Sequence, residues 1–105
     1  MTPGRLTFAA AVAVGLWSVP TQAETIQVTV ENLAFAPVEV NAKVGDTIEW
    51  INKDAFVHTA TATNGDWNIT LAPKQNGQLT LKKAGATEYF CKFHPNMKGR
   101  VIVAP

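Results

Sequence analysis

The sequence predicts an all-β domain, either a sandwich or a barrel, built from about eight short strands. Several short segments alternate apolar and polar residues, which is the pattern of a strand with one buried face. Turn signals that contain glycine separate these segments at short intervals. After residue 23, no stretch repeats its apolar residues with the 3.6-residue period of a helix. Short strands between regular turns are typical of sandwiches and barrels.

The expected strands follow one another along most of the chain. Residues 25–30 (TIQVTV) alternate strictly and open the series. The other strands are expected at residues 38–40, 47–51, 57–63, 67–71, 78–82, 87–91 and 101–103. Asn64-Gly65 and Asn76-Gly77 are interpreted as turns, because the Asn-Gly pair favours tight hairpins. The residues expected in the core are Trp50, Leu79, Leu81, Val101 and Val103.

The first 23 residues are expected to be a secretory signal peptide. Arg5 gives the start a positive charge, residues 6–17 are apolar, and Thr21 and Ala23 have the spacing that a signal peptidase reads. The apolar run is shorter than the roughly 20 residues that a membrane span needs. We therefore expect cleavage after Ala23, export to the periplasm, and one domain over residues 24–105 with no membrane span.

Composition narrows the possible partners. The 105 residues include nine Lys or Arg and eight Asp or Glu, so the net charge is close to neutral. Such a balance does not favour binding to nucleic acid or to an anionic membrane surface. The single cysteine, Cys91, cannot form an internal disulfide. In an exported protein, an unpaired cysteine is expected to be buried or bound to something.

That cysteine lies in the segment YFCKFHPNM, residues 89–97, together with two other side chains that bind metals. Cys91, His94 and Met97 follow the spacing Cys-x-x-His-x-x-Met, and we expect this segment to be a loop that curls around one point. Thiolate, imidazole and thioether form a soft donor set, which suits copper, whereas hard cations prefer oxygen ligands.

The second histidine of the chain completes a candidate site for one copper ion. His58 lies at the start of an expected strand, after a loop, and the loops of a sandwich gather at its two ends. The candidate ligands are therefore His58, Cys91, His94 and Met97. Two histidines and a cysteine in a plane, with a weak axial methionine, form the blue-copper arrangement.

Three other interpretations stay open. Taken singly, Cys91 and Met97 could be core residues, and His94 an ordinary loop residue. A zinc site is a second alternative, although zinc seldom recruits a thioether and structural zinc sites favour cysteine and histidine alone. A catalytic cysteine–histidine pair is a third, but it needs a pocket and an orienting third group.

Longer motifs extend the pattern across nearly the whole chain after residue 23. They are Phe35-x-Pro37, Val44-Gly45-Asp46-Thr47-Ile48-x-Trp50-x-Asn52-x-Asp54, the lone His58, and Tyr89-Phe90-Cys91-x-x-His94-Pro95-x-Met97-x-Gly99. With these motifs, the chain resembles the cupredoxins, or type 1 blue copper proteins, closest to the amicyanin, pseudoazurin and plastocyanin group. It departs from them in two ways. Thr59 stands where an asparagine commonly follows the first histidine ligand, and the stretch between His58 and Cys91 is short.

The resemblance implies a fold and a function. The fold would be a Greek-key β-sandwich of about seven to eight strands. The protein would not be an enzyme but a monomeric one-electron carrier, cycling a single type 1 copper ion between Cu(I) and Cu(II). Its partners would be a donor and an acceptor redox protein in the periplasm. The alternative function is a periplasmic protein that binds and delivers copper, which would favour an exposed and labile site.

Docking of a redox partner is expected near His94, the ligand expected to reach the surface. Phe93, Pro95, Phe56 and Ala55 would form an apolar patch there. A basic rim is expected around it, with Asp54 as the only nearby acid. The basic residues concerned are Lys53, Lys92, Lys98 and Arg100.

Overall fold

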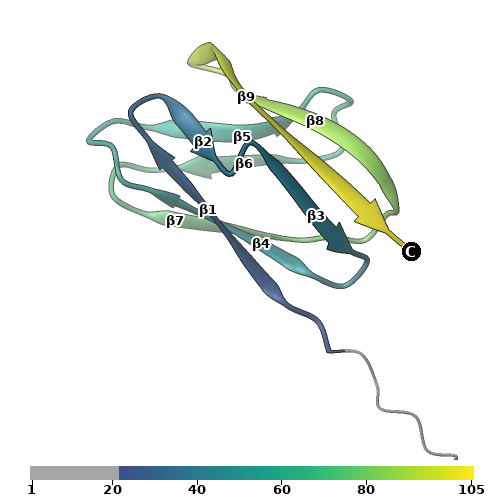
Figure 1. Ribbon diagram of the computed structural model, residues 1–105. Coiled ribbons are helices and arrows are strands. Elements are labelled where there is room, and N and C mark those ends of the chain that lie inside the picture. The colour runs from purple at the N-terminus through teal and green to yellow at the C-terminus, as the bar shows by residue number, and fades with distance from the viewer. Residues whose placement is uncertain (1–21) are drawn as a thin grey trace, which may run out of the picture.

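Nine strands and no helix make up residues 22–105, the part of the chain that the computed structural model describes (Figure 1). The strands are β1 (Thr25–Glu31), β2 (Ala34–Ala36), β3 (Glu39–Lys43), β4 (Thr47–Asn52), β5 (His58–Ala62), β6 (Asn68–Leu71), β7 (Asn76–Thr80), β8 (Gly85–Cys91) and β9 (His94–Ala104). Over the described range, no helix is long and apolar enough to cross a bilayer. The predicted signal peptide, residues 1–23, lies outside the described residues except for its last two positions.

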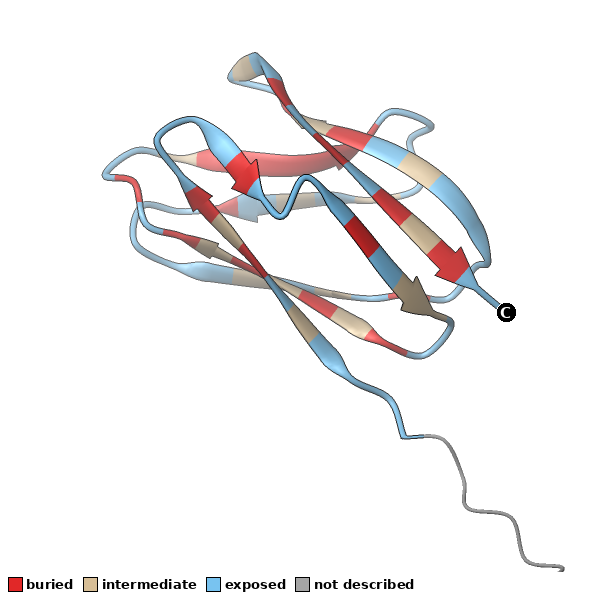
Figure 2. Cartoon of the chain, viewed as in Figure 1, coloured by how far each residue is buried: buried red, intermediate tan, exposed pale blue. Residues whose placement is uncertain are grey.

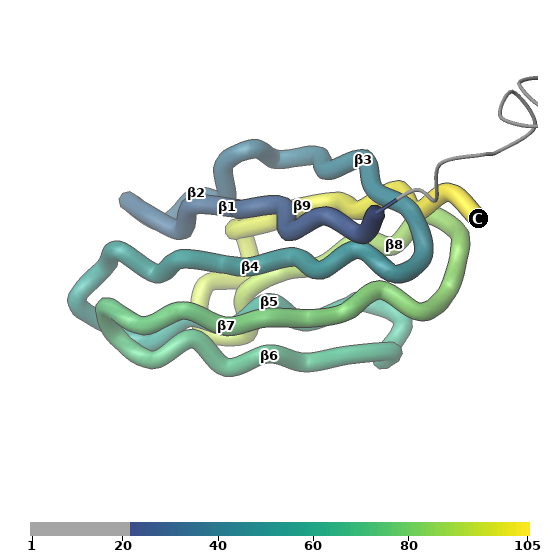
Figure 3. Tube along the Cα trace, turned by 90° about the horizontal axis from the view of Figure 1, so that it is seen from below, coloured from purple at the N-terminus to yellow at the C-terminus, as the bar shows by residue number. Residues whose placement is uncertain are grey.

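The strands form two sheets that pack face to face. One sheet has the order β2-β1-β4-β7 and the other the order β3-β9-β8-β5-β6. Figure 3 shows the two layers, with β6 and β7 side by side along one edge. The chain passes repeatedly from one sheet to the other, so neighbours in sequence are often in different layers. This arrangement confirms the predicted all-β sandwich.

Alternation along the strands produces the core between the sheets. In β4, Ile48 and Trp50 are fully buried, while Thr47, Glu49 and Ile51, which alternate with them, are partly exposed. Leu81, Val101 and Val103 are also buried, and Leu79 packs against the same cluster, as predicted. Figure 2 shows this banding in most strands, whereas β5 is buried along its whole length. The strand that begins with His58 is therefore shielded on both faces.

The predicted turn at Asn76-Gly77 is wrong, because both residues belong to β7. Gly77 lies opposite Trp50 in the ladder between β4 and β7. A Cβ atom at Gly77 would lie 2.6 Å from the side chain of Leu71 and 2.7 Å from that of Ile69. Glycine is therefore required here by close packing, not by a turn.

The structure also differs from the prediction at β2 and β9. The three residues of β2 were not predicted, because so short a segment shows no clear alternation. Strand β9 begins at His94, so only two residues separate it from β8 where a longer loop was expected. The buried position 99 carries no side chain, since a Cβ on Gly99 would collide with the ring of Tyr89. Gly99 thus hides the alternation that runs from Met97 to Val103.

Candidate metal centre

Three of the four predicted ligands converge at one end of the sandwich. The Sγ atom of Cys91 lies 3.5 Å from Nδ1 of His58 and 3.9 Å from Nδ1 of His94. All three donor atoms lie within 4.8 Å of one another. A metal bound at about 2.3 Å to sulfur and about 2.0 Å to nitrogen separates such donors by roughly 3.7 Å. The two sulfur–nitrogen distances are therefore close to those that a shared metal ion requires.

The strand order explains why these residues meet. His58 is the first residue of β5, Cys91 the last of β8 and His94 the first of β9. Strand β8 lies between β5 and β9 in the sheet, and Cys91 pairs directly with His94 after an irregularity in the ladder. The two histidines consequently approach Cys91 from its two neighbouring strands.

Met97, the fourth predicted ligand, is buried on β9. Only 3% of its surface is exposed, and it belongs to the same hydrophobic cluster as Cys91. A buried thioether three residues after His94 is suited to the weak axial position of a copper site.

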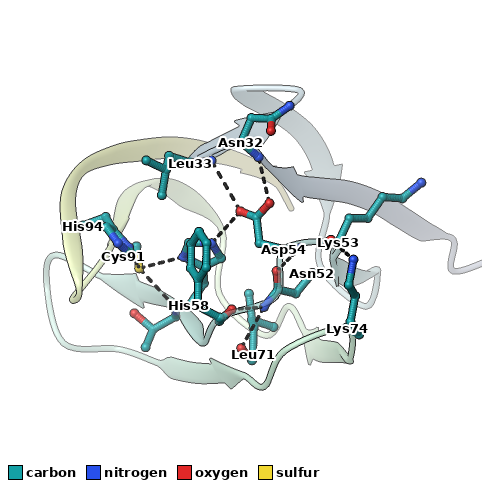
Figure 4. A network of polar contacts seen from close by, with 12 residues as sticks. Asn32, Leu33, Asn52, Lys53, Asp54, His58, Leu71, Lys74, Cys91 and His94 are labelled. Atoms are coloured by element: carbon teal, nitrogen blue, oxygen red, sulfur yellow. Dashed lines mark hydrogen bonds and ion pairs between the residues drawn. The ribbon is translucent and has the colours of Figure 1, made fainter.

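Asp54 orients His58, and sequence reasoning missed this role. Its Oδ2 atom lies 2.8 Å from Nε2 of the fully buried His58. When Nε2–H donates to this carboxylate, the lone pair of Nδ1 is free to face Cys91 (Figure 4). From the sequence, Asp54 is predicted only as an acid near the docking rim. Its position four residues before His58, in the motif that also contains Trp50 and Asn52, was the available sequence signal.

The Asp54 carboxylate is itself held by the turn between β1 and β2. It accepts hydrogen bonds from the backbone N–H groups of Asn32 at 3.0 Å and Leu33 at 3.4 Å. Both residues have positive φ angles, 54° and 62°, a conformation that is uncommon for leucine. Burial alone would raise the pKa of Asp54, but the hydrogen bonds from His58, Asn32 and Leu33 lower it further than burial raises it. The carboxylate is thus kept ionised and strongly accepting.

Asn52 fixes the loop that leads to His58. Its Nδ2 group donates to the carbonyl oxygens of Phe56 and Leu71 at 3.0 Å and of Ala72 at 3.1 Å. Its Oδ1 atom accepts the backbone N–H of Asp54 at 3.0 Å. This amide is almost fully buried, so the loop is held by bonds that water cannot easily replace.

Thr59 joins the His58 strand to the Cys91 turn. Its backbone N–H points to Sγ of Cys91 at 3.4 Å, and its Oγ1 accepts the backbone N–H of Lys92 at 2.9 Å. In similar proteins an asparagine commonly stands at this position and ties the two ligand segments together. A hydroxyl makes that tie here.

His94 is the only one of the three converging residues that is not fully buried, and the ring of Phe56 lies beside it. The ring of Phe56 lies 5.0 Å from His58 and 5.6 Å from His94, centroid to centroid. Phe56 is 45% exposed and Phe93 is 57% exposed. Leu33 is also exposed, so the end of the molecule near His94 has an apolar surface.

The charges around this end partly differ from the prediction. Lys53, Lys92 and Lys98 are exposed as expected. Arg100 lies 3.7 Å from Glu39, and this pairing reduces its contribution. Lys74 adds a charge that was not predicted. Its Nζ donates to the carbonyl oxygen of Lys53 at 2.7 Å, which places this ammonium group beside Lys53. Asp54 is buried and contributes little charge to this rim, whereas Glu31, at the end of β1 beside the turn that binds Asp54, is an exposed acid that was not predicted there.

The burial of Cys91 weakens the alternative of a catalytic cysteine–histidine pair. Cys91 is fully buried, so its sulfur cannot reach a substrate in the way that a catalytic nucleophile must.

The cupredoxin-like domain family matches residues 5–103 of the chain. Amicyanin of Paracoccus denitrificans is 33% identical over 84 residues, which cover 74% of this chain and 64% of that protein. Methylamine utilization protein MauL of Methylorubrum extorquens is 28% identical over 103 residues, covering 94% of this chain and 90% of that protein. The chain spans about two thirds of the length of the amicyanins that it matches.

Solved structures agree with the sequence comparisons. The crystal structure of amicyanin from Paracoccus versutus has a TM-score of 0.66 and 32% identity, covering 81% of this chain and 84% of that one. A structure of an oxidised amicyanin mutant has a TM-score of 0.67 and 31% identity, covering 74% of this chain and 80% of that one. The sequence family, the relatives and the fold lead to one conclusion: the chain belongs to the cupredoxin-like family.

Proposed function

We propose that this protein carries single electrons between redox partners by means of one type 1 copper ion. Its ligands would be His58, Cys91 and His94, with Met97 in the axial position. The observation that carries this proposal is the convergence of one cysteine sulfur and two imidazole nitrogens, with Cys91 and His58 fully buried and His94 partly so. Similarity to amicyanins supports it. When bound, copper supplies the couple between Cu(I) and Cu(II) that one-electron transfer needs.

The protein's own contribution is a rigid set of donors. Asp54 and Asn52 hold the segment of His58, and Thr59 ties that segment to the turn after Cys91. Donors that move little between oxidation states require little reorganisation when an electron arrives or leaves. Four protein donors would also leave no coordination position for a substrate, which argues for a carrier and against an enzyme.

Copper titration followed by visible spectroscopy tests the proposal. We expect one equivalent of Cu(II) to produce an intense visible band, because the thiolate of Cys91 forms a covalent bond to the metal. Addition of Zn(II) to a parallel sample should produce no band and serves as the control. A protein that stays colourless with Cu(II), or binds zinc in preference to copper, would contradict the assignment.

Copper delivery remains the alternative function, and the burial of the site speaks against it. Cys91 and His58 are both fully buried, whereas a donor protein would favour an exposed and labile site. Transfer of bound Cu(I) to a chelator separates the two functions. Release within minutes, without fast electron self-exchange, would favour delivery.

The assignment of Met97 can be tested by replacing it with leucine. The variant Met97→Leu should retain copper and the visible band, with a raised reduction potential, since only a weak axial donor is removed. Complete loss of copper binding would show that Met97 is needed to hold the metal.

We propose that redox partners dock over His94. An electron needs a short path to the copper, and His94 is the ligand closest to solvent. Exposed Phe56, Phe93 and Leu33 supply an apolar contact surface. Transient electron-transfer interfaces are small, often below about 1,200 Å², so a patch of this kind is sufficient. The basic rim favours a partner with an acidic surface.

We also propose that a signal peptide is removed after Ala23 and that the protein works in the periplasm as a monomer. The backbone nitrogen of Glu24 donates to Oδ1 of Asp46 at 2.9 Å. Asp46 is only 2% exposed, and Lys43 contacts it through Nζ at 3.2 Å. Cleavage before Glu24 would place a free ammonium group against this carboxylate, where a charge-assisted bond forms.

Mass spectrometry of the secreted protein tests the cleavage site, and size-exclusion chromatography tests the monomer. A chain that begins at Glu24 should unfold at a higher temperature than one that keeps Ala23 as an added first residue. In an Asp46→Asn background this difference should shrink. An intact N-terminus in the exported protein would contradict the proposal.

A further inference from the structure

A side-chain relay continues the sheet where its backbone ladder ends beside the metal centre. Strands β5 and β8 pair through Thr61 with Phe90 and Ala62 with Tyr89. Nearer to the metal centre, the described ladder between these strands goes no further, and the Cys91 sulfur occupies the space beside Thr59. Here the two strands are joined by the hydroxyl of Thr59 and the backbone N–H of Lys92.

The Thr59 hydroxyl is the middle of a longer chain of hydrogen bonds. Its Oγ1 lies 2.9 Å from Oγ1 of Thr61, two residues along β5 and therefore on the same face. Thr61 in turn donates to Oδ1 of Asn68 at 2.6 Å. Asn68 lies directly opposite Thr61 on the neighbouring strand β6 and is exposed. The chain thus runs from the surface of β6 to the residue after Cys91.

Each hydroxyl has one proton, and this sets the direction of the whole chain. The Thr61 hydroxyl donates its proton to Asn68. In the hydrogen bond between the two threonines, Thr59 must therefore be the donor and Thr61 the acceptor. The Thr59 oxygen then has only lone pairs to offer Lys92, whose N–H needs an acceptor. Both threonines are buried, 3% and 8% exposed, so a hydroxyl that lost its partner could not readily turn to water.

We propose that Thr61 and Asn68 are positioning residues for the copper ligand Cys91. They act through Thr59 and Lys92 and touch neither the ligand nor the metal. Asn68 accepts the hydroxyl proton of Thr61 and so sets its direction, and Thr61 does the same for the hydroxyl proton of Thr59. The Thr59 oxygen is thereby kept as a fixed acceptor for Lys92, and the turn after Cys91 is held at a constant distance from the strand of His58. The inference rests on the proposed copper function for its consequence, but the relay itself can be tested without metal.

The first experiment measures amide hydrogen exchange at Lys92 by NMR in the metal-free protein. Thr61→Val keeps the branched shape of the side chain but removes the hydroxyl. We expect exchange at Lys92 to accelerate about fivefold, the factor that corresponds to one ordinary net hydrogen bond. Thr61→Ser should restore the exchange rate. Thr63→Val is the matched control, because Thr63 is exposed and bonds to Glu88 outside the relay.

Asn68 offers a second pair of variants that leaves the core intact, since this side chain lies on the surface. Asn68→Ala removes the acceptor for Thr61 and should also accelerate exchange at Lys92. Asn68→Asp keeps an acceptor oxygen and should behave as the unchanged protein does. If Lys92 exchanges at its original rate in both Thr61→Val and Asn68→Ala, the relay does not position the turn.

The second experiment measures the visible band of the copper-loaded variants. Since hydrogen bonding around the cysteine sulfur tunes a type 1 site, the band should shift or broaden in Thr61→Val and Asn68→Ala. It should be unchanged in Thr63→Val and restored in Thr61→Ser. A band that is identical in all variants would overturn the link to Cys91. A protein that has no visible band at all, but still shows the change at Lys92, would refute the copper function and leave the relay standing.

Discussion

The two histidines of the metal centre are the same residue type in opposite surroundings. His58 is fully buried, and its second ring nitrogen is bound by Asp54 at 2.8 Å. Asp54 is in turn held by the turn between β1 and β2. His94 starts β9 after a two-residue turn, is partly exposed, and lies beside the exposed ring of Phe56.

The difference teaches how one small site combines rigidity with access. The inner segment, residues 52–58, is fixed by buried hydrogen bonds that hold Nδ1 of His58, the atom proposed to bind the metal, in place. The outer segment, residues 92–94, has a ligand near the surface among apolar side chains and basic charges. Cys91 directly precedes the outer segment in the chain, and its sulfur lies 3.5 Å from Nδ1 of His58 and 3.9 Å from Nδ1 of His94. A metal ion bound by these three donors would link the two segments.

Removing the shared sulfur should have the largest effect. In Cys91→Ser the intense visible band should disappear completely, because a hydroxyl neither ionises readily nor forms the covalent bond of a thiolate to copper. Absorption spectra of the variant with one equivalent of Cu(II) provide the measurement. A variant that keeps the band would show that the ligand assignment is wrong.

Removing copper should separate the two segments. A ligand that binds only the folded state stabilises it by roughly 4 kcal/mol at a 1,000-fold excess over Kd. We therefore expect a clear fall in melting temperature when copper is removed. Amide exchange should increase most in residues 92–94. The inner segment should change less, because the hydrogen bonds of Asp54 with His58 and of Asn52 with Asp54 do not depend on the metal. Equal melting temperatures with and without copper would show that copper does not stabilise the folded protein.

Loosening the inner segment alone should have a smaller effect. Asp54→Ala removes the acceptor of His58 and of two backbone amides, and copper affinity should fall about 10–100-fold. Competition with a chelator of known affinity measures this change. Asp66→Ala, which changes an acid in the turn between β5 and β6, is the control. An unchanged affinity in Asp54→Ala would mean that the orientation of His58 does not depend on this carboxylate.

Changing charges in and after the outer segment should have the smallest effect and leave the site itself intact. Lys92→Glu combined with Lys98→Glu should slow electron transfer to an acidic partner about tenfold at low salt, with an unchanged potential. The same reversal at Lys82 and Lys83, near the start of β8 and far from Cys91, is the matched control for net charge. A rate that is indifferent to salt and to both changes would rule out electrostatic docking at His94.

Much of the site could be predicted from local sequence. The spacing of Cys91, His94 and Met97 gathers soft donors within seven residues, and their chemistry favours copper wherever the chain places them. The alternation in β1 and β4 likewise predicts buried faces, because side chains of a strand point alternately to its two sides. These features depend on neighbours in sequence, so the sequence alone determined them.

Other features were decided only by the tertiary structure. His58 meets Cys91 because β5 and β8 are neighbours in one sheet, although 33 residues separate them. Gly77 is a strand residue because it pairs with Trp50 of β4, and the side chains of Leu71 and Ile69 leave no room there for a larger residue. No pattern of adjacent residues reports such contacts between distant segments.

The same holds for the groups that surround the ligands. Asp54 reads as a surface charge until the fold buries it between His58 and the turn of Leu33. In the sequence, Thr61 and Asn68 show no sign of a special role. The pairing of β5 with β6 brings Oγ1 of Thr61 to 2.6 Å from Oδ1 of Asn68. The sequence by itself determined which atoms could bind a metal, because that is a matter of side-chain chemistry. Only the folded chain decided what holds those atoms, because a hydrogen bond depends on distances and directions that arise when the strands pack.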